Sequence, residues 1–187
     1  MKVIPGEEEG CWVLIANNGE KALAHRLASE RCNFKSGLGI ATGRIDQTRS
    51  NEEITYLGFL AEILVCRILE VPFQNLQLFP GQDDGVDLVW RGFRIQVKAS
   101  YYPDGNLIVK NAKHLSEKKP YVADVFLLVT PVKDQADCFQ CSYIHINDAL
   151  PLIERVEFQP GSGIQEIVRK EFLKPLAKLI YEYYFQK

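Results

Sequence analysis

The sequence predicts an α/β protein in which a central mixed sheet is flanked by helices. Three stretches carry this prediction: an almost wholly apolar helix after residue 50, two short strands that form a hairpin between residues 86 and 99, and an apolar strand at 123–129. A helix that is apolar around most of its circumference is typical of one buried between layers, and a continuously apolar strand is typical of one covered on both faces. The chain has 187 residues, enough to bury such a core as a single domain spanning residues 1–187.

Residues 1–49 are predicted to form a helical extension before the core. From Gly19 to Cys32, apolar residues recur at helical spacing with charges between them, which indicates an amphipathic helix. The glycine-rich, basic stretch 33–51 follows and is predicted to be a connector. Contact between its basic side chains and phosphate groups is the alternative.

The core, about residues 50–150, begins with the apolar helix. Ser50 is a typical N-cap, acidic residues follow in the first turn, and Pro72 marks the end of the helix. Glu62 is the exception in this run, because a buried carboxylate is costly unless it meets a cation, a metal ion or several donors. An ion pair with Arg67 or Lys98 would satisfy Glu62, and so would a role in a functional site.

The run DDGVDLVWRGFRIQVKAS, residues 83–100, predicts a β-hairpin with Arg91-Gly92 as a two-residue turn. The expected cross-strand pairs are Trp90–Phe93, Val89–Arg94, Leu88–Ile95 and Asp87–Gln96. Paired residues share one face of a sheet, and alternation places Lys98 on the same face as Gln96. One face of the hairpin is therefore predicted to gather a carboxylate, an amide and an ammonium group. A salt bridge between Asp87 and Lys98 without any chemistry is the alternative.

Two further acids, Asp83 and Asp84, precede the hairpin. They are predicted to form the turn beside Gly85, and the alternative is that they supply further cation ligands.

After the hairpin, residues 107–110 predict a third strand, and the basic segment that follows predicts a short helix or loop. The candidate nucleic-acid contacts are Lys110, Lys113, Lys118 and Lys119. A solvated run of charge is the competing interpretation. An alternating strand is predicted at 139–147. The extension 151–187 is predicted to be helical and divided at Pro175, with an aromatic end that packs on the body of the fold or on a second copy.

The composition limits the partners. A net charge of −2 gives no overall basic field, so nucleic acid would have to bind at a local patch. Five irregularly spaced cysteines favour a reduced, cytoplasmic protein, and the single CxxC pattern at 138–141 lacks the second half of a zinc site. No apolar run reaches the length of a membrane span, so no membrane partner is expected.

Asp87, an interval of eight residues and then Gln96-Val97-Lys98 resemble the motif of the PD-(D/E)xK nuclease superfamily, in the QxK form of some restriction-endonuclease-like members. The resemblance covers about residues 58–129 and implies an αβββαβ core. It also implies a Mg²⁺- or Mn²⁺-dependent DNA endonuclease, restriction-like or junction-resolving, that works as a homodimer. In that case Asp87, Gln96, the Val97 carbonyl and Glu62 would ligate the metal, and Lys98 would orient or activate the attacking water.

The chain departs from the family pattern at two positions: Gln96 stands where a glutamate is usual, and Val86 stands where proline is usual. Because an amide is a poorer magnesium ligand than a carboxylate, a catalytically inactive DNA-binding or assembly module with the same fold is an alternative. An unrelated α/β protein with a salt-bridged hairpin is another. The sequence does not distinguish duplex, single-stranded or branched DNA from RNA as substrate.

Overall fold

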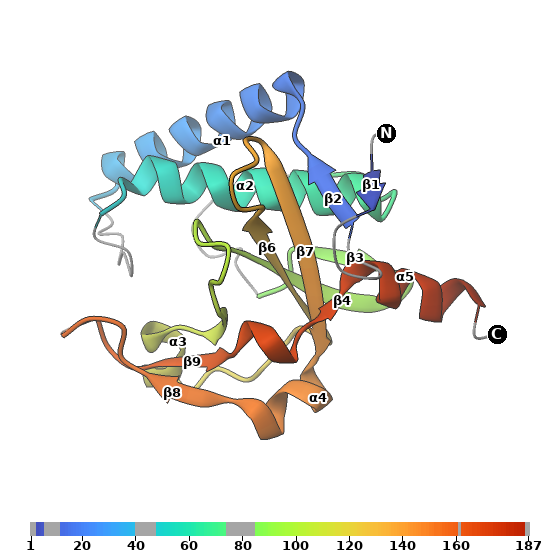
Figure 1. Cartoon of the computed structure of the whole chain (residues 1–187). Helices are drawn as coiled ribbons and strands as arrows, with labels where there is room; N and C mark the ends of the chain where they lie inside the picture. The colour runs from blue at the N-terminus through green and yellow to red at the C-terminus, as the bar shows by residue number, and fades with distance from the viewer. Residues whose placement is uncertain (1–2, 6–11, 40–47, 74–84, 161, 186–187) are drawn as a thin grey trace.

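The computed structural model of the chain describes residues 3–5, 12–39, 48–73, 85–160 and 162–185 (Figure 1). Its helices are α1 Asn18–Gly37, α2 Asn51–Ile68, α3 Ala112–Ser116, α4 Ile146–Ala149 and α5 Leu176–Phe185, with 3-10 turns at Leu150–Leu152 and Lys170–Phe172. Its strands are β1 Val3–Pro5, β2 Trp12–Ile15, β3 Leu88–Trp90, β4 Phe93–Ala99, β5 Leu107–Lys110, β6 Val125–Pro131, β7 Cys138–His145, β8 Glu154–Val156, β9 Gln165–Val168 and β10 Lys174–Pro175.

The strands form two sheets. The larger sheet has the order β1-β2-β7-β6-β4-β3, and β10 also pairs with β7. Within this sheet β4 and β6 are parallel, whereas the other pairs are antiparallel, so it is mixed as predicted. The smaller sheet has the order β5-β9-β8. In Figure 1, α1 and α2 lie side by side on one side of the larger sheet, and β8, β9 and α3 lie on the other side.

Strand β6 lies between two hydrophobic cores. Its residues Val125, Leu127 and Val129 belong to the cluster that includes the buried faces of α1 and α2. Phe126 and Leu128 point the other way, into a cluster with residues of the smaller sheet. The continuous apolar sequence of β6 is therefore explained, because both of its faces are covered.

Both long helices begin with a capping box. Asn17 caps α1 and Ser50 caps α2, and in each case the side chain accepts a hydrogen bond from the backbone of the third helical residue, whose own carboxylate accepts one in return. Helix α2 is buried along most of its length, as its apolar sequence predicts.

An ion pair joins the two helices. Arg67 of α2 donates from Nη1 to both carboxylate oxygens of Glu20, at 2.7 and 2.9 Å, and from Nη2 to the Ile15 carbonyl oxygen at 3.0 Å. The Glu20 side chain is only 12% exposed, so its charge depends on this partner.

We expect Arg67→Met to lower the free energy of unfolding by about 2 kcal/mol, because it leaves the Glu20 carboxylate enclosed without its cation. Urea denaturation followed by circular dichroism measures this loss. Arg26→Met is the matched control, since the Arg26–Glu30 pair lies on the surface and its loss should change stability by less than about 0.5 kcal/mol. Equal effects of the two substitutions would contradict the structural role of Arg67.

Three predictions need correction. The strand predicted at 107–110 is confirmed as β5, but it pairs with β9 in the smaller sheet, so it does not join the hairpin in one sheet as the αβββαβ resemblance implies. The extension 151–187 is not wholly helical, because β8, β9 and β10 precede α5 and the helix begins only at Leu176. All four residues of β9 are buried between β5 and β8, and this tertiary pairing outweighs a pattern that also fits a helix. The extension 1–49 contains α1 but also contributes β1 and β2 to the larger sheet.

The C-terminal helix α5 packs on the turn of the hairpin. Tyr183 contacts the rings of Trp90 and Phe93, with centroids 5.2 and 5.5 Å apart, and donates a hydrogen bond to the Arg91 carbonyl oxygen at 3.2 Å. The Arg91 guanidinium lies over the Tyr184 ring at 4.3 Å. The aromatic end of the chain therefore packs on the body of the fold, which is one of the two arrangements predicted for it. Among the described helices, none combines the length and the apolar character needed to cross a membrane.

Candidate functional site

The hairpin β3–β4 has the predicted register in the three pairs nearest the turn, Trp90–Phe93, Val89–Arg94 and Leu88–Ile95. Arg91 and Gly92 both have positive φ, at 50° and 89°. Positive φ at both central residues is typical of the type I′ turn, whose twist matches that of the flanking strands. The turn therefore fixes which residues of β3 face those of β4.

At Asp87 a side chain takes the place of regular backbone pairing. The Asp87 N–H donates to the Ile95 carbonyl oxygen at 2.8 Å, and Asp87 Oδ2 accepts from the Val97 N–H at 2.6 Å. The neighbouring residues of β4 point their backbone groups the other way, toward β6, as the bonds of the Arg94 carbonyl and the Ser100 N–H show. Because backbone groups alternate along a strand, the Val97 carbonyl lies on the same edge as the Asp87 carboxylate.

Glu62 reaches the same region from α2. Burial raises the pKa of the Cys66 thiol to about 12, and the negative charges of Glu62 and Asp87 add to this shift. Both carboxylates therefore act electrostatically on Cys66, although one comes from a helix and the other from the hairpin. Arg67, one of the two cations predicted beside Glu62, binds Glu20 instead.

Gln96 is buried on the opposite face of β4, with 7% of its surface exposed. Its neighbours Ile95 and Val97 belong to the helix-side core, whereas Gln96 opens onto a small cavity of about 180 Å³. The polar side chains that line this cavity with Gln96 are Lys110, His114, Lys119 and Tyr121. The Lys110 ammonium lies 3.9 Å from the centre of the Tyr121 ring. Two of the predicted nucleic-acid contacts thus share a cavity with a predicted site residue.

Hydrogen bonds that involve Glu166 and Arg155 hold Tyr121 in place beside this cavity. Its hydroxyl donates to Glu166, a buried carboxylate that also accepts from Arg155 at 3.1 and 3.2 Å. Burial and the Glu166 charge raise the pKa of Tyr121, so its hydroxyl stays protonated at neutral pH. The ring is thus held in place beneath the Lys110 ammonium.

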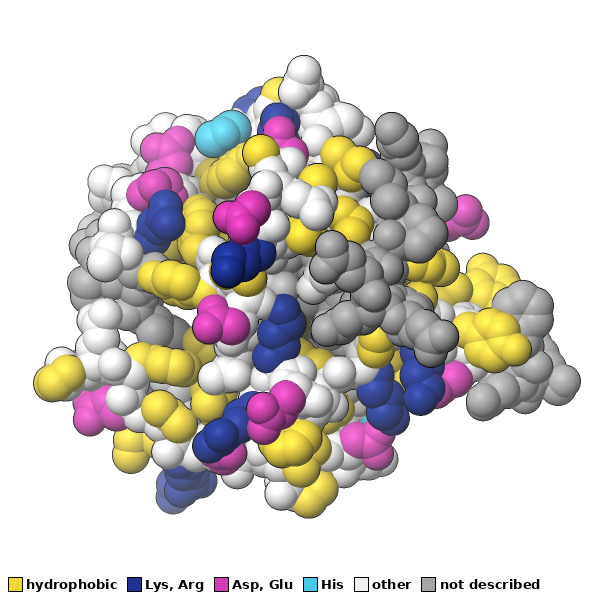
Figure 2. Space-filling view, in the orientation of Figure 1, with side chains coloured by type: hydrophobic (Ala, Val, Ile, Leu, Met, Phe, Trp, Pro, Cys, Tyr) yellow, Lys and Arg dark blue, Asp and Glu magenta, His cyan; other side chains and the backbone are white. Residues whose placement is uncertain are grey.

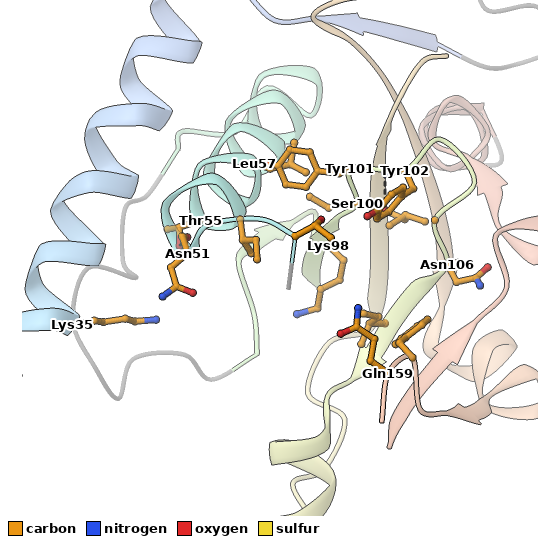
Figure 3. A pocket seen from close by; sticks show the side chains of 17 residues that line it. Lys35, Asn51, Thr55, Leu57, Lys98, Ser100, Tyr101, Tyr102, Asn106 and Gln159 are labelled. Atoms are coloured by element: carbon orange, nitrogen blue, oxygen red, sulfur yellow. Dashed lines mark hydrogen bonds between the residues drawn. The ribbon is translucent and has the colours of Figure 1, made fainter. Parts of the chain in front are cut away.

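Lys98 lies on the same face of β4 as Gln96, as alternation predicts, since these residues pair with Leu128 and Phe126 of β6. It lines a second, larger cavity of about 600 Å³ (Figure 3). Among the residues that the structure describes, none forms an ion pair with Lys98. The predicted alternative of an Asp87–Lys98 salt bridge is therefore absent from the described part of the chain.

The structure thus groups the predicted site residues in two sets. Asp87 binds the Val97 backbone, and Glu62 and Asp87 both act electrostatically on Cys66. Gln96 and Lys98 line two cavities on the face of β4 that lies toward the smaller sheet. Over the described stretches, no three His, Cys, Asp or Glu side chains lie close enough together to hold a metal ion.

Some predicted residues add little to this picture. Asp83 and Asp84 lie outside the described residues, and the side chain of Lys113 is likewise not described. Lys118 is exposed and adopts a positive φ of 52°. The sequence analysis missed Glu166, which lies on β9 and reaches this region because β5 pairs with β9. No local sequence signal indicates that pairing.

Charge is mixed over the face drawn in Figure 2, where basic and acidic side chains are interspersed among apolar ones. This agrees with the net charge of −2 and makes the local cavities the places where an anion would be attracted. Comparison of the chain with protein-family models, curated proteins and solved structures finds no match. The functional argument therefore depends on residue types and geometry.

Proposed function

We propose that the chain is a metal-dependent endonuclease that hydrolyses phosphodiester bonds in DNA, built on a restriction-endonuclease-like core. The observation that carries the proposal is the Asp87 carboxylate before β3, which accepts a hydrogen bond from the Val97 N–H. Glu62 on α2 and Asp87 both act electrostatically on the buried Cys66 thiol, which supports a shared site. Carboxylates and backbone carbonyls are the oxygen donors that a hard divalent cation such as Mg²⁺ binds.

The order of elements also supports the proposed core. Helix α2 precedes the β3–β4 hairpin, and the chain then crosses through β5 and α3 to reach β6, which pairs in parallel with β4. This accounts for a helix, a hairpin, a crossover and a parallel strand of the αβββαβ pattern. Strand β5 departs from the pattern because it belongs to the smaller sheet.

The available ligands fit a magnesium ion bound mainly by Asp87, with the Val97 carbonyl and Glu62 completing the share of the protein. When bound, such an ion would offset the negative charge of the phosphoryl oxygens and stabilise the leaving alkoxide. The Asp87 carboxylate is held beside β4, because it accepts a hydrogen bond from the Val97 N–H. Ligation by the Gln96 amide oxygen remains a prediction, because Gln96 opens onto a basic cavity.

Lys98 has the chemistry for positioning the attacking water. Its ammonium group carries three donors, and within the described residues no carboxylate neutralises it. The cavity beside Gln96 supplies further positive charge from Lys110 and Lys119, which favours a phosphate of the substrate backbone. The proposed partner is therefore DNA, bound at local sites on a protein of slight net negative charge.

Cleavage should require a divalent cation at a concentration on the order of millimolar, because one expected carboxylate is replaced by the neutral Gln96. If Gln96 ligates the cation, Gln96→Glu should lower the Mg²⁺ or Mn²⁺ concentration that gives half-maximal cleavage by about 10-fold, since it adds a negative ligand. Titrating each metal against purified protein with plasmid, single-stranded and branched DNA measures both effects. Cleavage in the presence of EDTA would rule out the metal-dependent mechanism.

A catalytically inactive DNA-binding or assembly module is the second candidate. The neutral amide of Gln96 and its basic surroundings favour this candidate, because they suit a bound phosphate better than a cation. The same titration separates the two candidates. DNA binding without cleavage under any metal condition, together with weaker DNA binding by Gln96→Glu, would support the module and contradict the nuclease.

A homodimer is part of the nuclease proposal. The exposed Tyr181 and Tyr184 of α5 form one surface for it, and sedimentation velocity tests it.

A further inference from the structure

The larger cavity lies beside Lys98 and is assembled from segments far apart in the sequence. It is enclosed by the first turns of α2, the end of β4 with the loop after it, β5, and the loop between β8 and β9. In Figure 3, Lys98 lies between Asn51 and Thr55 of α2 on one side and Gln159 on the other. The volume of the cavity, about 600 Å³, falls within the range of about 300–1,000 Å³ that is usual for small-ligand sites.

The loop that closes the cavity depends on a close approach at Gly105. A Cβ at this position would lie 2.1 Å from Ser100 Oγ, so no side chain fits there without displacing the loop. Ser100 Oγ in turn accepts a hydrogen bond from the Tyr102 N–H at 3.1 Å. The loop is therefore held in a shape that keeps Tyr102 at the cavity.

The lining combines aromatic rings, amides and positive charge. Tyr102 and Phe158 line the cavity and remain 50% and 41% exposed, so their rings are accessible to a ligand. Two lysines, Lys35 and Lys98, also line it, and none of the described lining residues is acidic. Rings, amides and cations without carboxylates suit a ligand that is flat, hydrogen-bonding and anionic.

Asn51 supplies an acceptor that the fold leaves unsatisfied. Asn51 lines the cavity, and its Oδ1 is buried and receives no hydrogen bond from any residue that the structure describes. A buried acceptor without a donor is costly, and natural proteins retain such a group mainly where a ligand or water completes it. The amino and imino groups on the edge of a nucleobase are donors of this kind.

We propose that this cavity binds one unpaired nucleotide of a single-stranded DNA segment. The base lies against Tyr102 and Phe158, its edge faces the Asn51 side chain, and the attached phosphate lies at Lys98. The choice of ligand rests on the proposed nuclease function, because Lys98 is the residue that this cavity shares with the proposed catalytic site. The inference deepens that function by naming the substrate class: DNA with an unpaired base at the site of cleavage.

A base in a duplex must unpair and unstack before it can enter such a cavity. This costs free energy, and the cost is smaller for a base that is already single-stranded. Base–aromatic stacking tolerates any sequence, because every base has a π-face. We therefore expect a preference for single-stranded over duplex DNA with little dependence on base sequence.

The test measures binding in EDTA, where no metal-dependent cleavage competes. Fluorescence anisotropy follows a short fluorescein-labelled oligodeoxynucleotide, alone and annealed to its complement, with wild type, Tyr102→Ala, Phe158→Ala and Asn51→Leu. We expect each cavity variant to weaken single-strand binding by about 10-fold and to leave the weaker duplex binding unchanged. Thermal melting checks that each variant is folded, and the two aromatic variants are sufficient if Asn51→Leu destabilises α2.

A matched control exists elsewhere on the surface. Phe172→Ala removes a phenylalanine that is 42% exposed and does not line the cavity. This control should bind the single strand as the wild type does. Wild-type affinity in the cavity variants, or an equal loss of duplex binding, would overturn the proposal.

The outcome also separates this proposal from the nuclease assignment. Cavity-dependent binding of single strands by a protein that cleaves no DNA with Mg²⁺ or Mn²⁺ would keep the nucleotide site and remove the nuclease. Metal-dependent cleavage that Tyr102→Ala and Phe158→Ala leave unchanged, with unchanged single-strand binding, would keep the nuclease and remove the nucleotide site.

Discussion

Asp87→Asn is expected to abolish metal-dependent DNA cleavage, with a loss on the order of 10³-fold or more in the single-turnover rate. The asparagine oxygen can still accept the hydrogen bond from the Val97 N–H, so the join between β3 and β4 should persist. What the substitution removes is the negative charge that is proposed to bind the cation. Single-turnover cleavage at saturating Mg²⁺ measures the rate, and thermal melting checks the fold.

Asp148→Asn is the control for this substitution. Asp148 is exposed and pairs with Lys174, and it takes no part in either set of site residues. Its variant should cleave at the wild-type rate. If Asp87→Asn also cleaves at that rate, Asp87 is not a metal ligand and the proposed site is wrong.

Lys98→Ala is expected to lower the cleavage rate by about 10²–10⁴-fold, the usual contribution of a side chain that positions or activates the attacking group. Because Lys98 is not proposed as a ligand, the metal concentration for half-maximal cleavage should stay unchanged. Lys98→Arg should not restore the rate, since a planar guanidinium cannot occupy the position of a compact ammonium group. Measuring the rate across a Mg²⁺ titration separates this effect from a loss of metal binding.

Lys133→Ala serves as the control, because Lys133 is an exposed residue in the turn between β6 and β7. A change in metal requirement for Lys98→Ala, with the maximal rate preserved, would show that Lys98 supports the metal site and does not act on the water.

Local signals predicted the parts of the fold that depend on neighbours in the chain. The Arg91-Gly92 turn and the period of two gave the hairpin register, and the cap at Ser50 gave the start of α2. The apolar run of β6 gave a strand covered on both faces. In each case the residues that determine the structure lie within a few positions of one another.

The parts that the sequence analysis missed depend on partners distant in the chain. Residues 165–168 fit a helical pattern as well as a strand, and the pairing of β9 with β5 and β8 decides between them. For the same reason β5 joined the smaller sheet, and the strand at 12–15 was overlooked although it pairs with β7.

The candidate site shows the same division. The residue types of Asp87, Gln96 and Lys98 and their shared hairpin were predictable from spacing. The cavities beside Gln96 and Lys98 were not, because their walls come from β5, α2 and the loop after β8. An unsatisfied acceptor such as Asn51 Oδ1 becomes visible only when all surrounding groups are in place.

Helix α5 contacts the turn between β3 and β4. Tyr183 bonds to the Arg91 carbonyl and Tyr184 contacts the Arg91 guanidinium, and β4 runs from that turn to Gln96 and Lys98. An affinity tag joined at the carboxyl end would therefore follow the helix that contacts this turn, whereas a tag at the amino end would precede β1, at the opposite edge of the larger sheet from the hairpin. A tag at the amino end is therefore the better choice for tests of the proposed activity.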